Sequence, residues 1–384
     1  MNIDSNTAII CLTQNGKKLA CKMKSLMNDG DIYFIQNKKD ESSKENSSKT
    51  IQVNIEDNIE IYTVHKRIKL FVGDIFDKYN YIVFIMATGI VIRTIAHLVT
   101  SKFSDPAILV TDEMGTNVIS LLSGHMGGAN EKTLYISNLL HANPVITTAT
   151  DVNKKSSLDM IAKKLDGYIE NFRDNVKDIN AMLVNNEPVG LYIDGDYDID
   201  TRGFNVIGSL EELSDCYSSN ETNRNKFEKI VVITNKNKLN SDKLEISISF
   251  ESDKLIKLVP KDIVVGIGCR RDIDSHLLKD SLQDFLENNN IDINAIRKIG
   301  SIEVKKDEKA IIDLSKYLGV TFKTLSAEDI SKVDYLFDKS EWVKKNVGVY
   351  SVAEPVAHIL SGGNLIIEKN KYKGITFSVG RAKI

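Results

Sequence analysis

The sequence YIVFIMATGIVIRTIAHLV, residues 81–99, is the most apolar stretch of the chain. It is almost long enough to span a membrane, but polar or small residues interrupt its middle, namely Thr88, Gly89, Arg93 and His97. A β-branched run stops at the Thr88-Gly89 pair and a helical pattern starts at once. The segment is therefore predicted to form a strand, a turn and a helix.

Four similar β-branched runs lie further along the chain: AILVT (107–111), PVITT (144–148), IVVIT (230–234) and DIVVGIG (262–268). They alternate with amphipathic stretches, which predicts an α/β fold with parallel sheets. After the last run, residues 273–286 show a helical apolar pattern, for which Asp272 is the predicted N-cap.

Length and composition narrow the classes of function. A chain of 384 residues is long enough for two or three domains. The net charge of −3 gives no general attraction to nucleic acid or to an anionic membrane. Four scattered cysteines without CxxC spacing, and an N-terminus without a secretory pattern, predict a reduced, cytoplasmic protein.

Three polar tracts, residues 37–50, 214–229 and 235–243, interrupt the apolar pattern. The first is predicted to be an exposed loop within the N-terminal domain. The other two suggest a domain boundary between about residues 235 and 260.

The Thr88-Gly89 turn is the first candidate binding site. The N-terminus of the predicted helix would present backbone N–H groups to an anion, and Arg93, one turn later, would add a fork of donors. The alternative is a tight connection followed by a surface arginine.

A second candidate is TDEMG, residues 111–115, in which Asp112 and Glu113 follow a predicted strand. Carboxylates at the carboxyl edge of an open α/β sheet face its usual ligand crevice, so either could act as a general base. A solvated turn explains the same residues.

The third candidate is the stretch SGHMGGANE, residues 123–131, just before a helix-like run. Its glycines Gly124, Gly127 and Gly128 permit close backbone approaches, and Ser123 and Asn130 flank them. His125 near a helix N-terminus would favour a neutral ring that can accept a proton near pH 7. A purely structural histidine is the alternative.

The segment DIVVGIGCRRD, residues 262–272, repeats the strand and glycine turn. It lacks the third glycine of a dinucleotide fingerprint. Cys269 beside Arg270 and Arg271 predicts either a thiol of lowered pKa or a small buried cysteine, and the arginines are candidate anion clamps. Glu354 and His358 have the spacing of metal ligands, but Pro355 between them favours a helix cap, so no metal site is predicted.

Taken together, these motifs resemble the cobalt-precorrin 5A hydrolases of anaerobic cobalamin biosynthesis, the CbiG type. The resemblance rests on motifs that occur in the family's order: MATGIVIRTIAHL, DPAILVTDEMG, VISLLSGHMGGANE, PVITTATDVN, VVGIGCRRD, KKDE and SVAEPVAHILSGG. It implies an N-terminal domain over residues 1–140, a middle region over 141–255 and a C-terminal domain over 256–384, all of α/β type.

The resemblance also implies a reaction. In this family water opens a ring-A lactone on a cobalt-bound tetrapyrrole, and the extruded carbon leaves with its methyl group as acetaldehyde. His125 or Glu113 would then activate water, and backbone N–H groups near Gly127, Gly128 and Ala129 would hold the oxyanion. The arginines Arg93, Arg270 and Arg271 would pair with substrate carboxylates. No protein-held cofactor is expected, because the substrate carries the cobalt.

Two other classes of function stay open. A carrier or scaffold of the same pathway would hold the tetrapyrrole without changing it, and acetaldehyde release separates the two. A nucleotide- or methyl-donor-dependent transferase would rest on the glycine turns alone. Neighbouring methyltransferases of the pathway are expected partners, whereas nucleic acid and membrane are not; the oligomeric state is not predicted.

Overall fold

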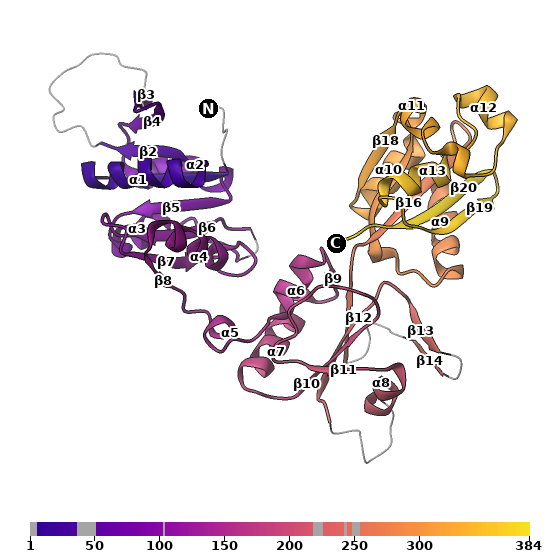
Figure 1. Ribbon diagram of the computed structural model, residues 1–384, viewed down its shortest axis with the longest axis horizontal. Coiled ribbons are helices and arrows are strands. Elements are labelled where there is room, and N and C mark those ends of the chain that lie inside the picture. Colours follow the sequence, from indigo (N-terminus) through magenta and orange to yellow (C-terminus); the bar gives the residue numbers. More distant parts are fainter. Residues whose placement is uncertain (1–5, 37–50, 103, 218–225, 242–243, 248–253) are drawn as a thin grey trace. The chain divides into compact units, whose positions relative to one another are not determined.

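The computed structural model describes residues 6–36, 51–102, 104–217, 226–241, 244–247 and 254–384. The chain divides into two compact units, Met1–Lys154 and Lys155–Ile384. The fold is mixed α/β and contains an eight-stranded sheet, two five-stranded sheets and one hairpin (Figure 1). The predicted loop at residues 37–50 lies outside the described residues, as does part of the tract at 214–229.

The first unit is built on the eight-stranded sheet, in the order β3-β4-β2-β1-β5-β6-β7-β8. Its strands are β1 (Thr7–Cys11), β2 (Asp31–Ile35), β3 (Ile51–Glu56), β4 (Ile59–Val64), β5 (Tyr81–Ile85), β6 (Ala107–Thr111), β7 (Asn117–Leu122) and β8 (Asn143–Val145). Its helices are α1 (Gln14–Met27), α2 (Ile68–Ile75), η1 (Phe76–Lys78), α3 (Thr88–Ile95), α4 (Ala129–Leu140) and α5 (Ala149–Val152).

Helices cover both faces of this sheet, which explains why its central strands are apolar on both sides. Side chains of α2 and α3 pack with one face in one hydrophobic cluster, and those of α1 and α4 pack with the other face in a second cluster. The strand, turn and helix predicted for residues 81–99 are confirmed as β5 and α3.

The direction of the strands reverses within this sheet. Strands β4, β2, β1, β5 and β6 are parallel, but β7 runs antiparallel to β6, and β8 is parallel to β7. The predicted α/β fold with parallel pairing is therefore confirmed for most strands of this sheet, while the antiparallel pairs β3-β4 and β6-β7 were not predicted. The five-residue connection from β6 to β7 is too short for the crossover that parallel neighbours require, so β7 has to turn back.

The second unit contains two five-stranded sheets. The middle sheet has the order β11-β10-β12-β15-β9, and the C-terminal sheet has the order β18-β17-β16-β20-β19. The strands of the middle part, including the hairpin β13-β14, are β9 (Tyr168–Ile169), β10 (Val189–Ile193), β11 (Asn205–Ile207), β12 (Lys229–Ile233), β13 (Lys238–Ser241), β14 (Leu244–Ser247) and β15 (Leu255–Val259). Its helices are α6 (Leu158–Lys164), α7 (Phe172–Val184) and α8 (Leu210–Tyr217).

The C-terminal sheet consists of β16 (Ile263–Cys269), β17 (Ile296–Ile302), β18 (Thr321–Leu325), β19 (Leu365–Tyr372) and β20 (Ile375–Arg381). The helical elements around it are α9 (Ser275–Asn288), η2 (Ile293–Ala295), η3 (Glu303–Lys305), α10 (Lys309–Leu318), α11 (Ala327–Ser331), η4 (Asp334–Leu336), α12 (Glu341–Val347) and α13 (Ala353–Leu360). The prediction that Asp272 is the N-cap is wrong. Asp272 adopts a left-handed φ of 55°, and Asp274 caps α9 two residues later.

Buried polar contacts join these two sheets within the second unit. The fully buried carboxylate of Asp262, between β15 and β16, accepts hydrogen bonds from Tyr197 Oη at 2.9 Å, Asn235 Nδ2 at 2.9 Å and Arg381 Nε at 2.6 Å. Lys257 of β15 pairs with Asp292, and both side chains are buried. A buried charge is costly unless it is paired, and these partners offset part of that cost.

Candidate functional site

The histidine loop, residues 123–128, lies where β7 ends. Because β7 is antiparallel to β6, its last residue Leu122 pairs with Ile108, near the start of β6. Strand β7, helix α4 and strand β8 form a parallel β-α-β unit, so the loop and α5 both follow carboxyl ends of parallel strands. Such ends are the usual ligand edge of an open α/β sheet.

Backbone contacts close this loop on itself. Ser123 adopts a left-handed φ of 58°, and its carbonyl accepts the N–H of Ala129 at 3.1 Å. A Cβ on Gly127 would lie 2.4 Å from Ser123 Cβ, and one on Gly124 would lie 2.7 Å from Asn130 Oδ1. The two glycines are therefore required for the close approach that the sequence predicted.

The same contacts correct one expectation. The N–H of Gly128 donates to the His125 carbonyl at 2.9 Å, and the N–H of Ala129 donates to Ser123. These two groups are engaged inside the loop and are not directed at a ligand. The prediction that they hold an oxyanion is therefore wrong for Gly128 and Ala129, while the role of Gly127 stays a prediction.

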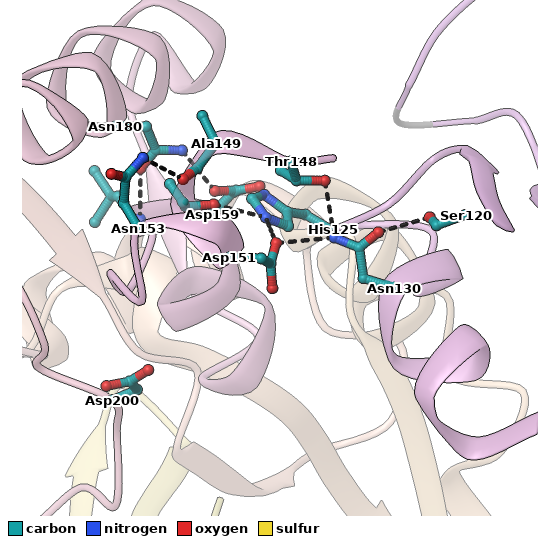
Figure 2. Close-up of polar contacts among 12 residues, drawn as sticks. Ser120, His125, Asn130, Thr148, Ala149, Asp151, Asn153, Asp159, Asn180 and Asp200 are labelled. Atoms are coloured by element: carbon teal, nitrogen blue, oxygen red, sulfur yellow. Dashed lines mark hydrogen bonds and ion pairs between the residues drawn. The ribbon is translucent and has the colours of Figure 1, made fainter. Parts of the chain in front are cut away.

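The side chain of His125 points toward α5 (Figure 2). Its Nε2 lies 3.0 Å from Asp151 Oδ2 and 2.9 Å from Thr150 Oγ1. The imidazole is 17% exposed, and the Asp151 side chain is 42% exposed. A histidine in contact with a carboxylate and open to solvent on part of its surface can exchange protons with a bound molecule.

Asn130, in the first turn of α4, connects the loop to α5. Its buried amide donates from Nδ2 to Asp151 Oδ2 at 2.9 Å and to Thr148 Oγ1 at 3.0 Å, while Oδ1 accepts from Ser120 Oγ at 2.6 Å (Figure 2). A carboxylate accepts but does not donate, so the NH₂ side of the amide must face Asp151. Both amide protons and the amide oxygen are thus used.

The turn at Thr88 and Gly89 lies at the opposite edge of the same sheet. Helix α3 starts directly after β5, with Ala87 as its N-cap and no capping side chain. The guanidinium of Arg93 bends back to this turn and donates from Nη1 to the Gly89 carbonyl at 2.9 Å. The three predicted anion-binding residues are therefore neighbours, although their ligand stays a prediction.

Asp112 and Glu113 also lie at that opposite edge, after β6. The Asp112 carboxylate accepts the N–H groups of Met114, Thr116 and Asn117. Burial alone would raise its pKa, but these hydrogen bonds hold the pKa below its usual value. Such an aspartate shapes the β6–β7 turn and is a weak base.

Glu113 is bound at this edge as well. Its Oε2 accepts the hydroxyl of Thr13 at 2.5 Å, and Thr13 Oγ1 in turn caps α1 by accepting the N–H of Gly16. The full length of β6, five residues or roughly 15 Å, lies between this edge and the histidine loop. The predicted site residues of the first unit thus form two groups, with His125, Ser123, Gly124, Gly127, Gly128 and Asn130 in one and Thr88, Gly89, Arg93, Asp112 and Glu113 in the other.

In the second unit, Cys269 ends β16, and Arg270 and Arg271 follow it as exposed residues. The pKa of the Cys269 thiol is raised to about 11, mainly by burial. The charge of Lys305 opposes this rise, and the charge of Glu308 adds to it. The predicted low-pKa thiol is therefore wrong, and the alternative of a small, fully buried cysteine fits only in part, because Cys269 is half-buried. The KKDE motif supplies a buried ion pair, Lys305 Nζ to Glu308 Oε2 at 3.0 Å.

The Glu354 and His358 pair does not share a contact that would suggest a metal. Glu354 is buried and accepts from Ser351 Oγ and from the backbone N–H of Lys369, while His358 packs edge-on against Phe337. Among the residues with described positions, no three His, Cys, Asp or Glu side chains are grouped to hold a metal ion. Within the same ranges, no helix is long and apolar enough to cross a membrane.

Four residues that contact the candidate site were missed from the sequence: Ser120, Thr148, Thr150 and Asp151. Three of them belong to the motif PVITTATDVN, which carried the resemblance without receiving a role. The available signal was a polar run, TTATD, directly after an apolar strand. Sequence separation hid the contact, since Asp151 lies 26 residues from His125.

Three family models match the chain. Residues 71–151 match "Cobalamin synthesis G N-terminal", residues 156–246 match "Cobalamin biosynthesis central region", and residues 263–380 match "Cobalamin synthesis G C-terminus". The first match covers the histidine loop and α5 as far as Asp151, and the third covers Cys269, Arg270 and Arg271.

Among curated proteins, the chain is similar to a cobalt-precorrin-5A hydrolase of Salmonella typhimurium, with 40% identity over 80% of this chain and 83% of the relative. A cobalt-precorrin-5A hydrolase of Priestia megaterium is 27% identical over 97% of this chain and 94% of the relative. A solved structure described as a cobalamin biosynthesis protein G homolog from Sulfolobus solfataricus is 24% identical, covers 98% of this chain and 97% of its own, and gives a TM-score of 0.36.

Proposed function

Because the chain belongs to the cobalamin synthesis G (CbiG) family, we propose that it is a cobalt-precorrin-5A hydrolase. The observation that carries the proposal is the 40% identity to a relative of that name, over four fifths of both chains. His125 of the histidine loop, in contact with Asp151, supplies the acid–base group that a hydrolysis needs.

The proposed reaction consumes one water and releases one acetaldehyde. Water adds to the ring-A lactone carbonyl, and collapse of the tetrahedral intermediate gives a carboxylate and a hydroxyl on the extruded carbon. Loss of the hydroxyl proton then forms the aldehyde C=O as the bond from that carbon to the macrocycle breaks. The electron pair of that bond stays with the macrocycle, which takes up a proton.

Both steps need a base, one for the water and one for the hydroxyl. We assign this role to His125, which is partly exposed, contacts a carboxylate and lies at a ligand edge of the sheet. General base catalysis contributes typically about 10²–10⁴-fold to a rate. Glu113 is the weaker candidate because it is bound by Thr13 on the other edge of the sheet.

Several arginines are proposed to recognise the substrate. Arg270 and Arg271 are exposed after the central strand β16. Arg93 lies in the last turn of α3, and its guanidinium reaches back to the Gly89 carbonyl in the first turn. Guanidinium groups bind carboxylates through paired N–H donors, and the substrate presents several acetate and propionate arms. No cofactor held by the protein enters the proposal, since cobalt arrives as part of the substrate.

Anaerobic turnover tests the proposal against the carrier alternative. The purified full-length chain is incubated with cobalt-precorrin 5A while volatile aldehyde is trapped and the corrinoid mass is followed. One acetaldehyde per delactonised product supports the hydrolase. Tight binding of the tetrapyrrole without aldehyde release, under conditions in which the Salmonella relative turns over, would contradict it and support a carrier.

A further inference from the structure

We propose that two copies of the chain associate through strand β3. The open edges of the two strands pair antiparallel about a twofold axis at Val53 and join the two eight-stranded sheets into one. This interface goes beyond the proposed function and does not depend on it.

Strand β3 is an open edge of its sheet. It is the outermost strand (Figure 1), and within the part of the chain that the structure describes β4 is its only strand partner. The two strands are joined by the two-residue turn of Asp57 and Asn58, whose φ values are 49° and 64°. Positive φ at both positions is typical of a type I′ hairpin, in which the flanking residues, here Glu56 and Ile59, form a hydrogen-bonded pair.

This turn determines which backbone groups of β3 face outward. Hydrogen-bonded and non-hydrogen-bonded pairs alternate along an antiparallel ladder. Counted back from the bonded pair at Glu56, every second residue of β3 is bonded to β4, and the N–H and C=O groups of Ile51, Val53 and Ile55 point away from it. No described backbone contact joins these outward groups to another segment.

The side chains of the same three residues form an apolar row. Ile51, Val53 and Ile55 alternate with polar residues and therefore lie on one face of the strand. Ile51 packs against the hydrophobic cluster of that face, but Val53 is 57% exposed and Ile55 is 69% exposed. Exposed apolar side chains beside unpaired backbone groups favour pairing with a further strand.

The other edge strands of the three large sheets are protected. Strand β8 has three residues and contains Pro144, β18 has Lys323 at its centre, and β19 contains Lys369 and Lys371 and is irregular in register. Strands β11 and β9 have only three and two residues. Short strands, prolines, lysines and bulges oppose edge-to-edge pairing, and the six residues of β3 show none of these features.

The sequence of β3 complements itself in one register. An antiparallel second copy with its Val53 opposite Val53 places Ile51 opposite Ile55 on both sides of the axis. All outward residues then form bonded pairs, three pairs with two hydrogen bonds each, or about six bonds. The twofold axis also keeps the apolar rows of both copies on one face, where β-branched cross-strand pairs are stabilising.

Charge does not oppose this pairing. Glu56 is the only charged residue of β3, and Lys17 Nζ of the same chain lies 2.7 Å from its carboxylate. Two copies therefore do not bring unpaired like charges opposite each other, which would be destabilising. The edge thus fits a second copy of this chain, which supplies the matching apolar row.

Sedimentation velocity of the full-length chain over a range of concentrations tests the interface. Val53→Lys places two like charges at the axis, and Val53→Pro removes an outward N–H but leaves the bonds to β4 in place. Val206→Lys is the matched control, because Val206 is 56% exposed and lies in the edge strand β11. A melting temperature close to that of the wild type verifies folding of each variant.

We expect a monomer–dimer equilibrium of the wild type with a Kd on the order of 10 µM, because a six-residue edge buries less surface than a standard interface. Val53→Lys and Val53→Pro should each raise the Kd at least about tenfold, whereas Val206→Lys should change it less than about twofold.

A cross-link tests the register. Bonded partners at the axis lie about 5.5 Å apart between Cα atoms, which suits a disulfide. Mild oxidation should therefore give a covalent dimer of Val53→Cys. Gln52→Cys and the oxidised wild type, with its four cysteines, should give none, because two copies of position 52 lie more than about 7 Å apart in this register.

A wild type that stays monomeric at about 200 µM, well above the expected Kd, would overturn the proposal. A dimer whose Kd is unchanged in both folded Val53 variants, or is raised equally by Val206→Lys, would overturn it as well. If neither Val53→Lys nor Val53→Pro folds, the cross-link decides: its absence in oxidised Val53→Cys contradicts pairing at this axis.

Discussion

His125 and Glu113 lie at opposite edges of one sheet, although only 12 positions separate them in the sequence. His125 follows β7, whose end Leu122 pairs with Ile108, whereas Glu113 follows β6 at the other end of that strand. One water molecule cannot contact both side chains across roughly 15 Å of strand. The choice between the two candidate bases is therefore a choice between two edges, and the Asp151 contact favours the edge that holds His125.

Replacing Glu113 by Gln tests this choice. The substitution removes the charge but keeps an oxygen that can accept the Thr13 hydroxyl. We expect turnover to stay within about twofold of the wild type, with a small fall in the melting temperature because a charge-assisted hydrogen bond is replaced by a neutral one. If the folded Glu113→Gln protein instead turned over about 100-fold more slowly or worse, the base would have to lie at the other edge.

Gly127→Ala tests the requirement for a closed histidine loop. An added Cβ would lie 2.4 Å from Ser123 Cβ, so the loop would have to open and would displace His125. We expect turnover to slow at least about tenfold and the melting temperature to fall. Gly73→Ala in α2 is the control, since its Cβ would come no closer than 3.9 Å to a side chain and alanine favours helix. Equal kinetics for both variants would show that the loop tolerates the change.

The arginines after β16 are expected to affect binding more than chemistry. Arg270→Gln and Arg271→Gln each remove a guanidinium that is exposed and able to pair with a substrate carboxylate. Steady-state kinetics should show KM raised about tenfold with kcat little changed, which is typical of a contact made equally in ground and transition states. The effect should shrink as salt is added. A fall in kcat at constant KM would contradict a binding role.

The pH dependence of stability should reveal Asp112. Its pKa is lower in the folded protein than in the unfolded chain, where it is about 4, so the ionised form stabilises the fold above that pH. As the pH falls through the folded pKa, the carboxylate is protonated and this stabilisation is lost. The difference in melting temperature between the wild type and Asp112→Asn should therefore be largest near neutral pH and shrink below about pH 4. A difference that stays constant down to about pH 3 would contradict this role.

Local pattern was sufficient to predict several elements. The apolar run at residues 81–85, its stop at Thr88-Gly89 and the helix that follows agree with β5 and α3, because strand and helix periods differ clearly over that segment. The direction of β7 was missed, although the short connection at residues 112–116 contains the necessary information. Because this short connection makes β7 antiparallel to β6, Glu113 lies at one end of the two strands and His125 at the other.

The contacts of the site were harder to predict than its loop. The glycines around His125 indicate a close backbone approach, and Gly127 against Ser123 is such an approach. The partner of the imidazole is fixed by tertiary structure, because α4 and β8 must return the chain before Asp151 can reach His125. Cys269 shows the reverse error. Its arginine neighbours in the sequence suggested a reactive thiol, but burial raises the pKa of the thiol and outweighs the opposing charge of Lys305.

Single-turnover acetaldehyde release by the wild type and by His125→Gln, measured anaerobically at saturating cobalt-precorrin 5A, tests the role of His125 most directly. We expect stoichiometric aldehyde from the wild type and a rate at least about 100-fold lower from the variant, with similar melting temperatures and similar tetrapyrrole binding. Equal rates of aldehyde release from the two proteins would remove His125 from the mechanism and contradict its assignment as the base.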